Sequence, residues 1–142
     1  MGRSALIVVD THVLVWAVQD DRRLGSSARA LIDQAIRADG LHVAAITPLE
    51  IAMLVQRGRL ALGRDVAAWI DEVLSLPGVH VVPLEPAICV DSVRLPGDAQ
   101  GDPADRMIIA TARHEGFPLL TGDRTILAYG VAGHVGTVDA RE

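Results

Sequence analysis

The sequence predicts an α/β fold, a three-layer α/β/α sandwich around a mostly parallel central sheet. Short apolar runs rich in Val, Ile and Leu alternate along the chain with segments of helical spacing, as in sheets whose strands are joined by helices. The length of 142 residues suits a single domain, 1–142, with one good core. No linker, internal repeat or low-complexity tract divides the sequence.

Strands are predicted from the short apolar runs. In chain order these runs cover 5–9, 41–46, 79–84, 118–121 and 135–138. Helices are predicted where apolar residues recur every three or four positions between capping residues and glycines. They cover 11–18, a stretch from 26 or 27 to the residue before Gly40, 48–57, 64–76, 86–95, 103–114 and 126–129.

Polar residues at three helix starts indicate how these helices begin. Ser26 or Ser27 is expected to cap the second helix. Thr47 and Glu50 form the pattern of a capping box, in which the Glu bonds back to the Thr. Asp102 is expected to cap the helix that follows it, whose middle is apolar nearly all round and therefore predicted to be buried on several sides.

Composition excludes several classes of protein. All 13 basic residues are Arg, and the absence of Lys excludes a Walker-type phosphate loop, a Schiff-base enzyme and a receiver domain that needs its lysine. The one cysteine, Cys89, excludes an internal disulfide and is expected to be a small core residue. No apolar run reaches the ~18 residues of a membrane span, and the N-terminus lacks a signal peptide's apolar region, so we expect a cytoplasmic protein.

Four acidic residues stand where predicted strands end or the next helices begin. These residues are Asp10, Glu50, Asp105 and Asp123. Because the carboxyl ends of parallel strands share one edge of the sheet, we expect the four side chains to converge there. Gathered carboxylates repel one another unless a cation joins them, and an all-oxygen ligand set suits Mg²⁺ or Mn²⁺. The sequence therefore predicts a divalent-metal site, whose acids account for most of the formal charge of −5.

Each acid also has a purely structural explanation. Asp10 would cap the helix after it, and Glu50 would belong to the capping box. Asp102 and Asp105 lie three residues apart at one helix start, where Asp102 is the better cap and Asp105 the better ligand. Asp123 would be a turn residue. Only the metal-site interpretation accounts for all the acids together.

Four successive segments carry these acids, namely 8–16 (VVDTHVLVW), 45–52 (AITPLEIA), 101–112 (GDPADRMIIATA) and 120–123 (LTGD). In this order they resemble the motifs of PIN-domain proteins, and of VapC-like toxins of toxin–antitoxin pairs in particular. The third motif is the most distinctive, and the resemblance covers essentially the whole chain.

The resemblance implies a PIN-like fold and a Mg²⁺- or Mn²⁺-dependent endoribonuclease that forms a homodimer and is inhibited by a cognate antitoxin protein. By matching motifs, Asp10, Glu50 and Asp105 take the places of the three core acids, and Asp123 takes the less constant fourth place. Asp102 belongs to the motif variant seen here, with its role left open. Carboxylates holding one or two metal ions would activate a water for hydrolysis of RNA phosphodiester bonds.

Other polar residues adjoin these acids. Thr11, Thr47 and Thr121 are candidates to orient water or ligands. Arg106 and Arg124 each follow a candidate ligand directly, so they are candidates for contacts with the RNA backbone or for salt bridges within the site.

Two other functions fit part of the pattern. A metal-dependent phosphatase would place a second acid two residues after its aspartate nucleophile, where this chain has His12. A non-catalytic RNA- or protein-binding module of the same fold would be expected to have lost one or more of the acids, all of which are present.

The helices expected at 11–18 and 48–57 carry more apolar side chains than one sheet face needs. These side chains are Val13, Leu14, Trp16, Ile51, Leu54 and Val55. We therefore expect part of this surface to form a homodimer interface, with a groove beside it for an amphipathic antitoxin segment.

Overall fold

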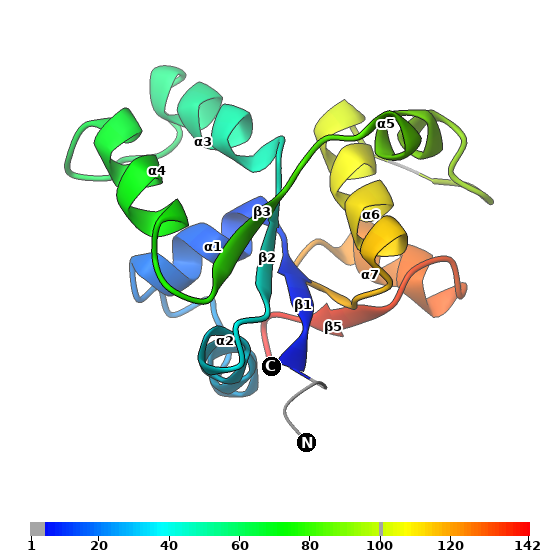
Figure 1. Cartoon of the computed structure of the whole chain (residues 1–142), viewed down its shortest axis with the longest axis horizontal. Helices are drawn as coiled ribbons and strands as arrows, with labels where there is room; N and C mark the ends of the chain where they lie inside the picture. Colours follow the sequence, from blue (N-terminus) through cyan, green and yellow to red (C-terminus); the bar gives the residue numbers. More distant parts are fainter. Residues whose placement is uncertain (1–4, 100) are drawn as a thin grey trace.

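A five-stranded sheet forms the centre of the computed structural model, which describes residues 5–99 and 101–142 (Figure 1). Its strands are β1 (Ile7–Val9), β2 (Leu41–Ala44), β3 (Val79–Val82), β4 (Leu119–Thr121) and β5 (Thr137–Asp139). They lie in the order β3-β2-β1-β4-β5, and all four neighbouring pairs are parallel. The predicted α/β class with a mostly parallel sheet is confirmed.

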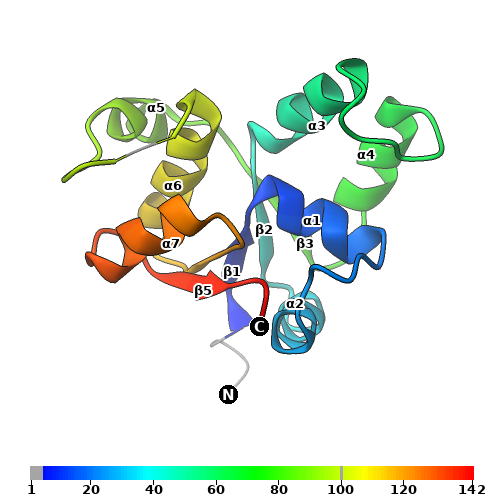
Figure 2. The same cartoon turned by 180° about the vertical axis from the view of Figure 1, so that it is seen from behind.

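Helices cover both faces of the sheet. One face carries α1 (Thr11–Val18), α2 (Ser26–Arg37), α3 (Thr47–Gln56) and α4 (Val66–Leu74), and the other carries α5 (Pro86–Val93), α6 (Pro103–Glu115) and α7 (Arg124–Val131). Figure 1 and Figure 2 show these two groups of helices, with the sheet between them, from opposite sides. The three predicted layers are therefore present.

The sheet is buried on both faces because alternate strand residues enter two separate hydrophobic cores. In β1, Ile7 and Val9 pack into the core shared with α1 to α4, whereas Val8 packs into the core shared with α5 to α7. Such double cover is typical of parallel sheets; it is complete at the central strand β1, whereas Val81 on the edge strand β3 is 41% exposed. The apolar middle of α6, residues 108–112, is fully buried, as its sequence predicted.

The predicted cap of α2 is wrong. Gly25 occupies the N-cap position, ahead of the two serines, and makes no side-chain cap bond. Backbone carbonyls from the end of the chain replace the serine hydroxyl, since Gly25 N–H donates to Ala140 O and Ala28 N–H donates to Glu142 O, both at 2.9 Å. This approach is so close that a Cβ on Gly25 would lie 2.1 Å from Glu142 O.

The predicted capping box of α3 is also wrong. Ile46 occupies the N-cap position in helical conformation, and Thr47 is already the first helical residue. The physical reason is burial, because Thr47 is fully buried and its hydroxyl lies 2.9 Å from that of Thr11 on α1. Glu50 is therefore free of the role that the capping box would have given it.

The other predicted elements are present, and their ends differ from the prediction by only a few residues. β2 and β3 stop earlier than expected, at Ala44 and Val82, and α7 is longer than the expected 126–129. The helix predicted over 64–76 covers 66–74, where Asp65 caps it by accepting from Ala68 N–H at 3.2 Å.

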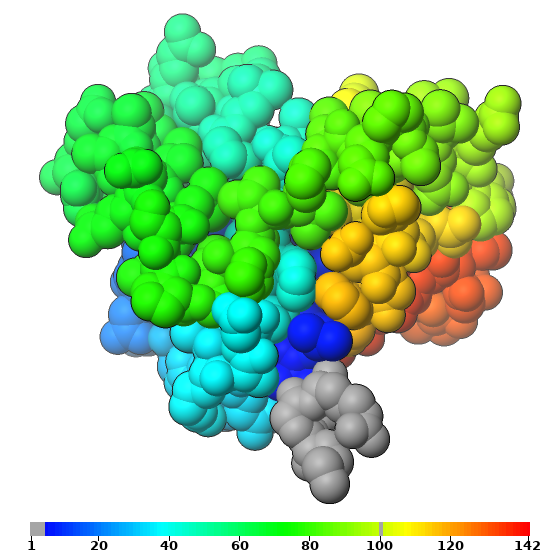
Figure 3. All heavy atoms as spheres, viewed as in Figure 1, coloured from blue at the N-terminus to red at the C-terminus, as the bar shows by residue number. Residues whose placement is uncertain are grey.

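The carboxyl ends of the strands meet at one edge of the sheet. α1 begins directly after the residue that follows β1, and α7 begins three residues after β4. α3, α5 and the start of α6 rise above this edge (Figure 1). In the space-filling view the surface dips between α3 and the pair α5–α6 (Figure 3).

Most of the side chains expected to form the dimer interface are buried within the single chain. Val13, Leu14, Trp16 and Ile51 are all at most 5% exposed within the single chain, where they form part of the core. The prediction overestimated the exposed apolar surface because α1 packs between the sheet and α3, so its apolar residues are covered on more than one side.

Within residues 5–99 and 101–142, none of the helices combines the length and the apolarity that a bilayer crossing requires.

Candidate metal centre

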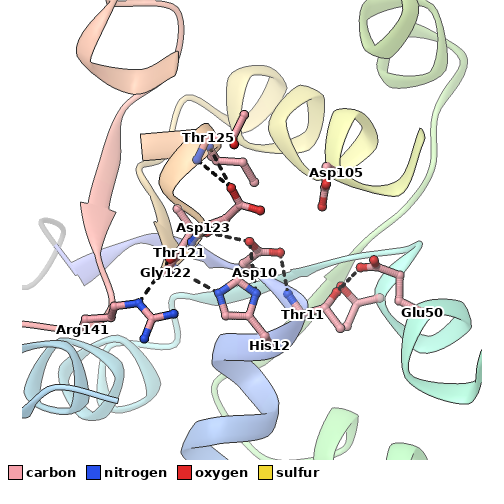
Figure 4. Close-up of polar contacts among 12 residues, drawn as sticks. Asp10, Thr11, His12, Glu50, Asp105, Thr121, Gly122, Asp123, Thr125 and Arg141 are labelled. Atoms are coloured by element: carbon pink, nitrogen blue, oxygen red, sulfur yellow. Dashed lines mark hydrogen bonds and ion pairs between the residues drawn. The ribbon is translucent and has the colours of Figure 1, made fainter. Parts of the chain in front are cut away.

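Asp10 stands at the end of β1, as the N-cap residue of α1, and only 3% of it is exposed. Both of its carboxylate oxygens accept hydrogen bonds. Oδ1 accepts from the backbone N–H of Thr11 at 2.8 Å, and Oδ2 accepts from the hydroxyl of Thr121 at 2.6 Å. The side chain is thus fixed by the start of its own helix and by the end of the neighbouring strand β4 (Figure 4).

Glu50 enters the same region from α3, through a pair of threonines. The Thr11 hydroxyl donates to Glu50 Oε1 at 2.5 Å, and it also lies 2.9 Å from the Thr47 hydroxyl. Since Thr11 has one hydroxyl hydrogen and gives it to Glu50, Thr47 must be the donor to Thr11. The two threonines thus form a directed chain, from Thr47 through Thr11 to Glu50, that ties α3 to α1.

Asp102 and Asp105 enter from the start of α6. Asp102 is the N-cap residue and accepts from Asp105 N–H through Oδ1 at 2.9 Å, as the sequence predicted. Its carboxylate also belongs to a cluster with Glu50 and Asp105, in which ligand oxygens all lie within 4.8 Å of one another. Asp102 is therefore both the N-cap residue of α6 and a member of the acidic cluster, two roles that the sequence had presented as alternatives.

Asp123 is the N-cap residue of α7 and lies on the other side of Asp10 (Figure 4). Its Oδ1 accepts from Thr125 N–H at 2.8 Å and from Ile126 N–H at 3.2 Å. Its own N–H donates to the Thr121 hydroxyl oxygen at 3.0 Å, and that hydroxyl in turn donates to Asp10. Thr121 therefore links two of the candidate ligands.

The crowding of negative charge is visible in the pKa values. Burial, and then the charges of Asp102, Asp10, Asp123 and Glu50, raise the pKa of Asp105 from 3.8 to about 7. The pKa of Glu50 is raised in the same way, mainly by burial and further by Asp10 and Asp102, although the hydrogen bond from Thr11 opposes this shift. The acids thus act on one another electrostatically as a single group.

His12 links α1 to the loop after β4, an arrangement that the sequence did not predict. Its Nε2 accepts from the Gly122 backbone N–H at 3.0 Å, so in the neutral ring the proton is on Nδ1. That Nδ1 lies 3.5 Å from Asp10 Oδ2. His12 therefore helps to hold Asp10, and it is not the second acid that a phosphatase would need.

The structure does not place Arg106 where its sequence position suggested. Its guanidinium donates to the carbonyls of Ser92 and Ala99, both at 2.9 Å, and reaches that of Val93 at 3.5 Å. These donors are used to hold the end of α5 and the loop that follows, so they are not available to RNA or to the acids. Arg124 is exposed at the start of α7 and keeps its predicted role as a hypothesis.

The donor set fits a hard divalent cation. Every candidate ligand is a carboxylate, and the ligands of Mg²⁺ and Mn²⁺ in proteins are chiefly oxygens. Glu50 Oε2 accepts no hydrogen bond from the described residues, so this oxygen is free to bind an ion. An ion joining the carboxylates would remove the repulsion that raises the pKa of Asp105.

The family model of the PIN domain matches residues 7–131. The chain belongs to the PIN domain family. Ribonuclease VapC22 of Mycobacterium tuberculosis is 35% identical to it over 123 residues, which cover 87% of this chain and 91% of that protein.

Solved structures of low sequence identity share the PIN fold. One is the crystal structure of VapBC2 from Rickettsia felis bound to a DNA fragment from the promoter of its genes. It has a TM-score of 0.69 at 11% identity and covers 94% of this chain and 98% of that one. Another is a toxin–antitoxin complex from Klebsiella pneumoniae, with a TM-score of 0.58 at 19% identity, covering 94% and 97%.

The raised pKa of Asp105 leads to a prediction about the stability of the metal-free protein. The folded chain holds this proton more tightly than the unfolded chain, so the free energy of unfolding falls as pH rises from about 4 to about 7. Asp105→Asn removes this loss. In EDTA its melting temperature should exceed that of the wild type by a margin that grows over this pH range and is constant above it.

Asp71→Asn, on the exposed face of α4, is the matched control and should show a margin that does not depend on pH. Thermal melts of the three proteins at several pH values make the comparison. An Asp105→Asn margin as flat as that of Asp71→Asn would contradict the raised pKa of Asp105.

Proposed function

We propose that this PIN-domain protein is a metal-dependent endoribonuclease that acts in the cytoplasm as the toxin of a toxin–antitoxin pair, with Mg²⁺ or Mn²⁺ as its cofactor. The observation that carries the proposal is the group of ligand oxygens from Glu50, Asp102 and Asp105, which lie within 4.8 Å of one another at the carboxyl edge of the sheet. The 35% identical relative is named a ribonuclease, and one structural neighbour is a toxin–antitoxin complex, which supports an antitoxin partner.

Glu50, Asp102, Asp105 and Asp10 would hold the cation, and Asp123 would complete the site directly or through water. When bound, a divalent cation supplies a water of lowered pKa as the nucleophile and neutralises charge on the phosphate that is attacked. The neutralisation of charge is needed here because a site made of carboxylates alone repels an RNA phosphate.

The contribution of the chain is to fix the carboxylates in advance. Thr11 serves two of them, since its N–H holds Asp10 and its hydroxyl holds Glu50. Thr121 holds the second oxygen of Asp10. Because buried donors set these orientations, little reorganisation is required when the ion and the substrate bind. The predicted roles of Thr11, Thr47 and Thr121 thereby become positioning of ligands rather than of water.

Loss of a single ligand should abolish hydrolysis without unfolding the protein. Asp10→Asn and Asp105→Asn should each lower Mg²⁺-dependent cleavage of single-stranded RNA by at least about a hundredfold, as the removal of a catalytic group does. Cleavage is measured on a labelled RNA, alongside hydrolysis of p-nitrophenyl phosphate and with circular dichroism to monitor folding.

The same assay separates the alternative functions. A wild-type protein that hydrolyses only the phosphate ester would be a phosphatase. One that binds RNA or protein but cleaves nothing in either metal would be a non-catalytic module. Near-normal RNA cleavage by either Asn variant would contradict its assignment as a ligand.

Asp102 provides a test that separates capping from ligation. Ser is also a good N-cap residue, so Asp102→Ser should keep the melting temperature of the wild type. It removes a carboxylate from the cluster, however, and cleavage should fall markedly at low Mg²⁺ concentration. Asp102→Ala should lose the same activity and in addition about 0.5–2 kcal/mol of stability. Full activity of Asp102→Ser would show that Asp102 is only a cap.

We still propose a homodimer, but with an interface other than the one expected from the sequence. The exposed apolar side chains near the carboxyl edge include Val93 at 77% and Val90 at 48% on α5, and Leu49 at 54% on α3. Sedimentation at about 50 μM, in the range of a weak dimer, should show a dimer that Val93→Glu dissociates. A wild-type monomer at that concentration would refute this assignment.

A further inference from the structure

On the side of the metal centre where His12 lies, three side chains pack around the indole ring of Trp16. The rings of His12 and Trp16 meet edge-on, with centroids 4.8 Å apart. The guanidinium carbons of Arg23 and Arg141 each lie 5.1 Å from the centroid of the Trp16 ring. Since Trp16 is only 5% exposed, its ring is a support that holds two cations rather than a surface for a ligand.

Only one of these two cations is neutralised. Arg23 donates to both carboxylate oxygens of Asp21, at 3.0 and 2.8 Å. Arg141 donates through Nε to the Gly122 carbonyl at a long 3.4 Å, and it forms no ion pair with a carboxylate of residues 5–99 and 101–142. The charge of Arg141 is thus held in place at the rim of the acidic centre without being compensated (Figure 4).

Next to Trp16 lies a groove of about 150 Å³ between α1 and the loop after α3. His12, Trp16, Arg23 and Arg59 contribute to its lining, and no carboxylate of residues 5–99 and 101–142 does so. The side chain of Arg59 is exposed and, like that of Arg141, has no carboxylate partner in the described part of the chain. The groove therefore carries the charge of Arg59, and it adjoins Arg141 through Trp16 and Asp10 through His12.

We propose that Arg59 and Arg141 bind backbone phosphates of single-stranded RNA and lead the strand to the carboxylates, an inference that rests on the proposed ribonuclease function. A polyanion that approaches clustered carboxylates needs cations beside them, and the planar guanidinium is well suited to phosphate. Arg141, Gly122, His12 and Asp10 follow one another through contacts of 3.4, 3.0 and 3.5 Å. A phosphate on Arg141 is therefore only a short series of contacts away from Asp10.

The test compares Arg59→Gln/Arg141→Gln with Arg37→Gln, which removes an exposed charge at the last residue of α2, next to the amino end of the sheet. Affinity for a fluorescent single-stranded RNA is measured by anisotropy in Mg²⁺ and in the Asp10→Asn background, at several salt concentrations. Cleavage kinetics are measured with Asp10 intact.

The double variant should bind RNA at least about tenfold more weakly, as the loss of charge-assisted hydrogen bonds does. The slope of log affinity against log salt should become shallower by about 0.7 for each lost phosphate contact. KM should rise while kcat stays near that of the wild type. Arg37→Gln should change none of these quantities. Arg141→Lys, made with Arg59 intact, keeps the charge and should therefore have most of the salt slope of the wild type.

Several outcomes would overturn the inference. The first is an affinity and salt slope of the double variant equal to those of Arg37→Gln. The second is a loss that Arg141→Lys does not restore and that follows the melting temperature, since Arg141 would then only brace Trp16 and Gly122. The third is unchanged RNA binding with weakened inhibition by the antitoxin, which would assign the groove to that protein.

The inference and the proposed function fail separately. RNA cleavage without an effect of the two arginines would leave the ribonuclease in place and refute this binding track. RNA binding that depends on the two arginines, without cleavage by the wild type, would support this binding track and refute the ribonuclease function. A wild-type protein that neither binds nor cleaves RNA would refute both.

Discussion

The structure depends on confining several carboxylates at one edge of a parallel sheet, where no arginine of residues 5–99 and 101–142 forms an ion pair with them. Asp10, Asp102 and Asp123 are the N-cap residues of α1, α6 and α7, so each accepts hydrogen bonds from the first turn of a helix. The positive ends of these helix dipoles point toward the negative charge and offset part of the repulsion. Capping and ligation are thus compatible, because the bonds that start the helices also hold the acids in place.

Much of the fold could be predicted because its strands and helices differ in period and because both faces of the sheet need cover. The apolar runs of β1, β2 and β3 and the apolar face of α4 carry this signal locally. The errors arose where distant parts of the chain satisfy a helix start. The backbone carbonyl of Glu142 accepts a hydrogen bond from Ala28 N–H at the start of α2, and the hydroxyl of Thr47, expected to cap α3, bonds to Thr11 instead. No local pattern contains such partners.

The candidate acids could be predicted from their places after strands and from the motifs that carry them, but side-chain direction could not. Arg106 follows Asp105 directly, yet consecutive helical residues point about 100° apart. Its guanidinium therefore points away from the acids and binds the carbonyls of Ser92 and Ala99. Arg141 was missed for the opposite reason, since it is far from every motif in sequence and comes close only through the packing of the chain end against Gly122 and Trp16.

The hydrogen bond from Thr121 to Asp10 spans 111 residues and has a consequence for the growing polypeptide. Asp10 is made 111 residues before its partner, which lies on β4, the strand that pairs with β1 in the middle of the sheet. A nascent chain that has not yet reached residue 121 contains most of the acids but lacks this donor and the strand that carries it. Contacts of such long sequence separation also slow folding, because a long loop must be closed before they form. The centre can therefore be complete only after β4 and Asp123 have been synthesised.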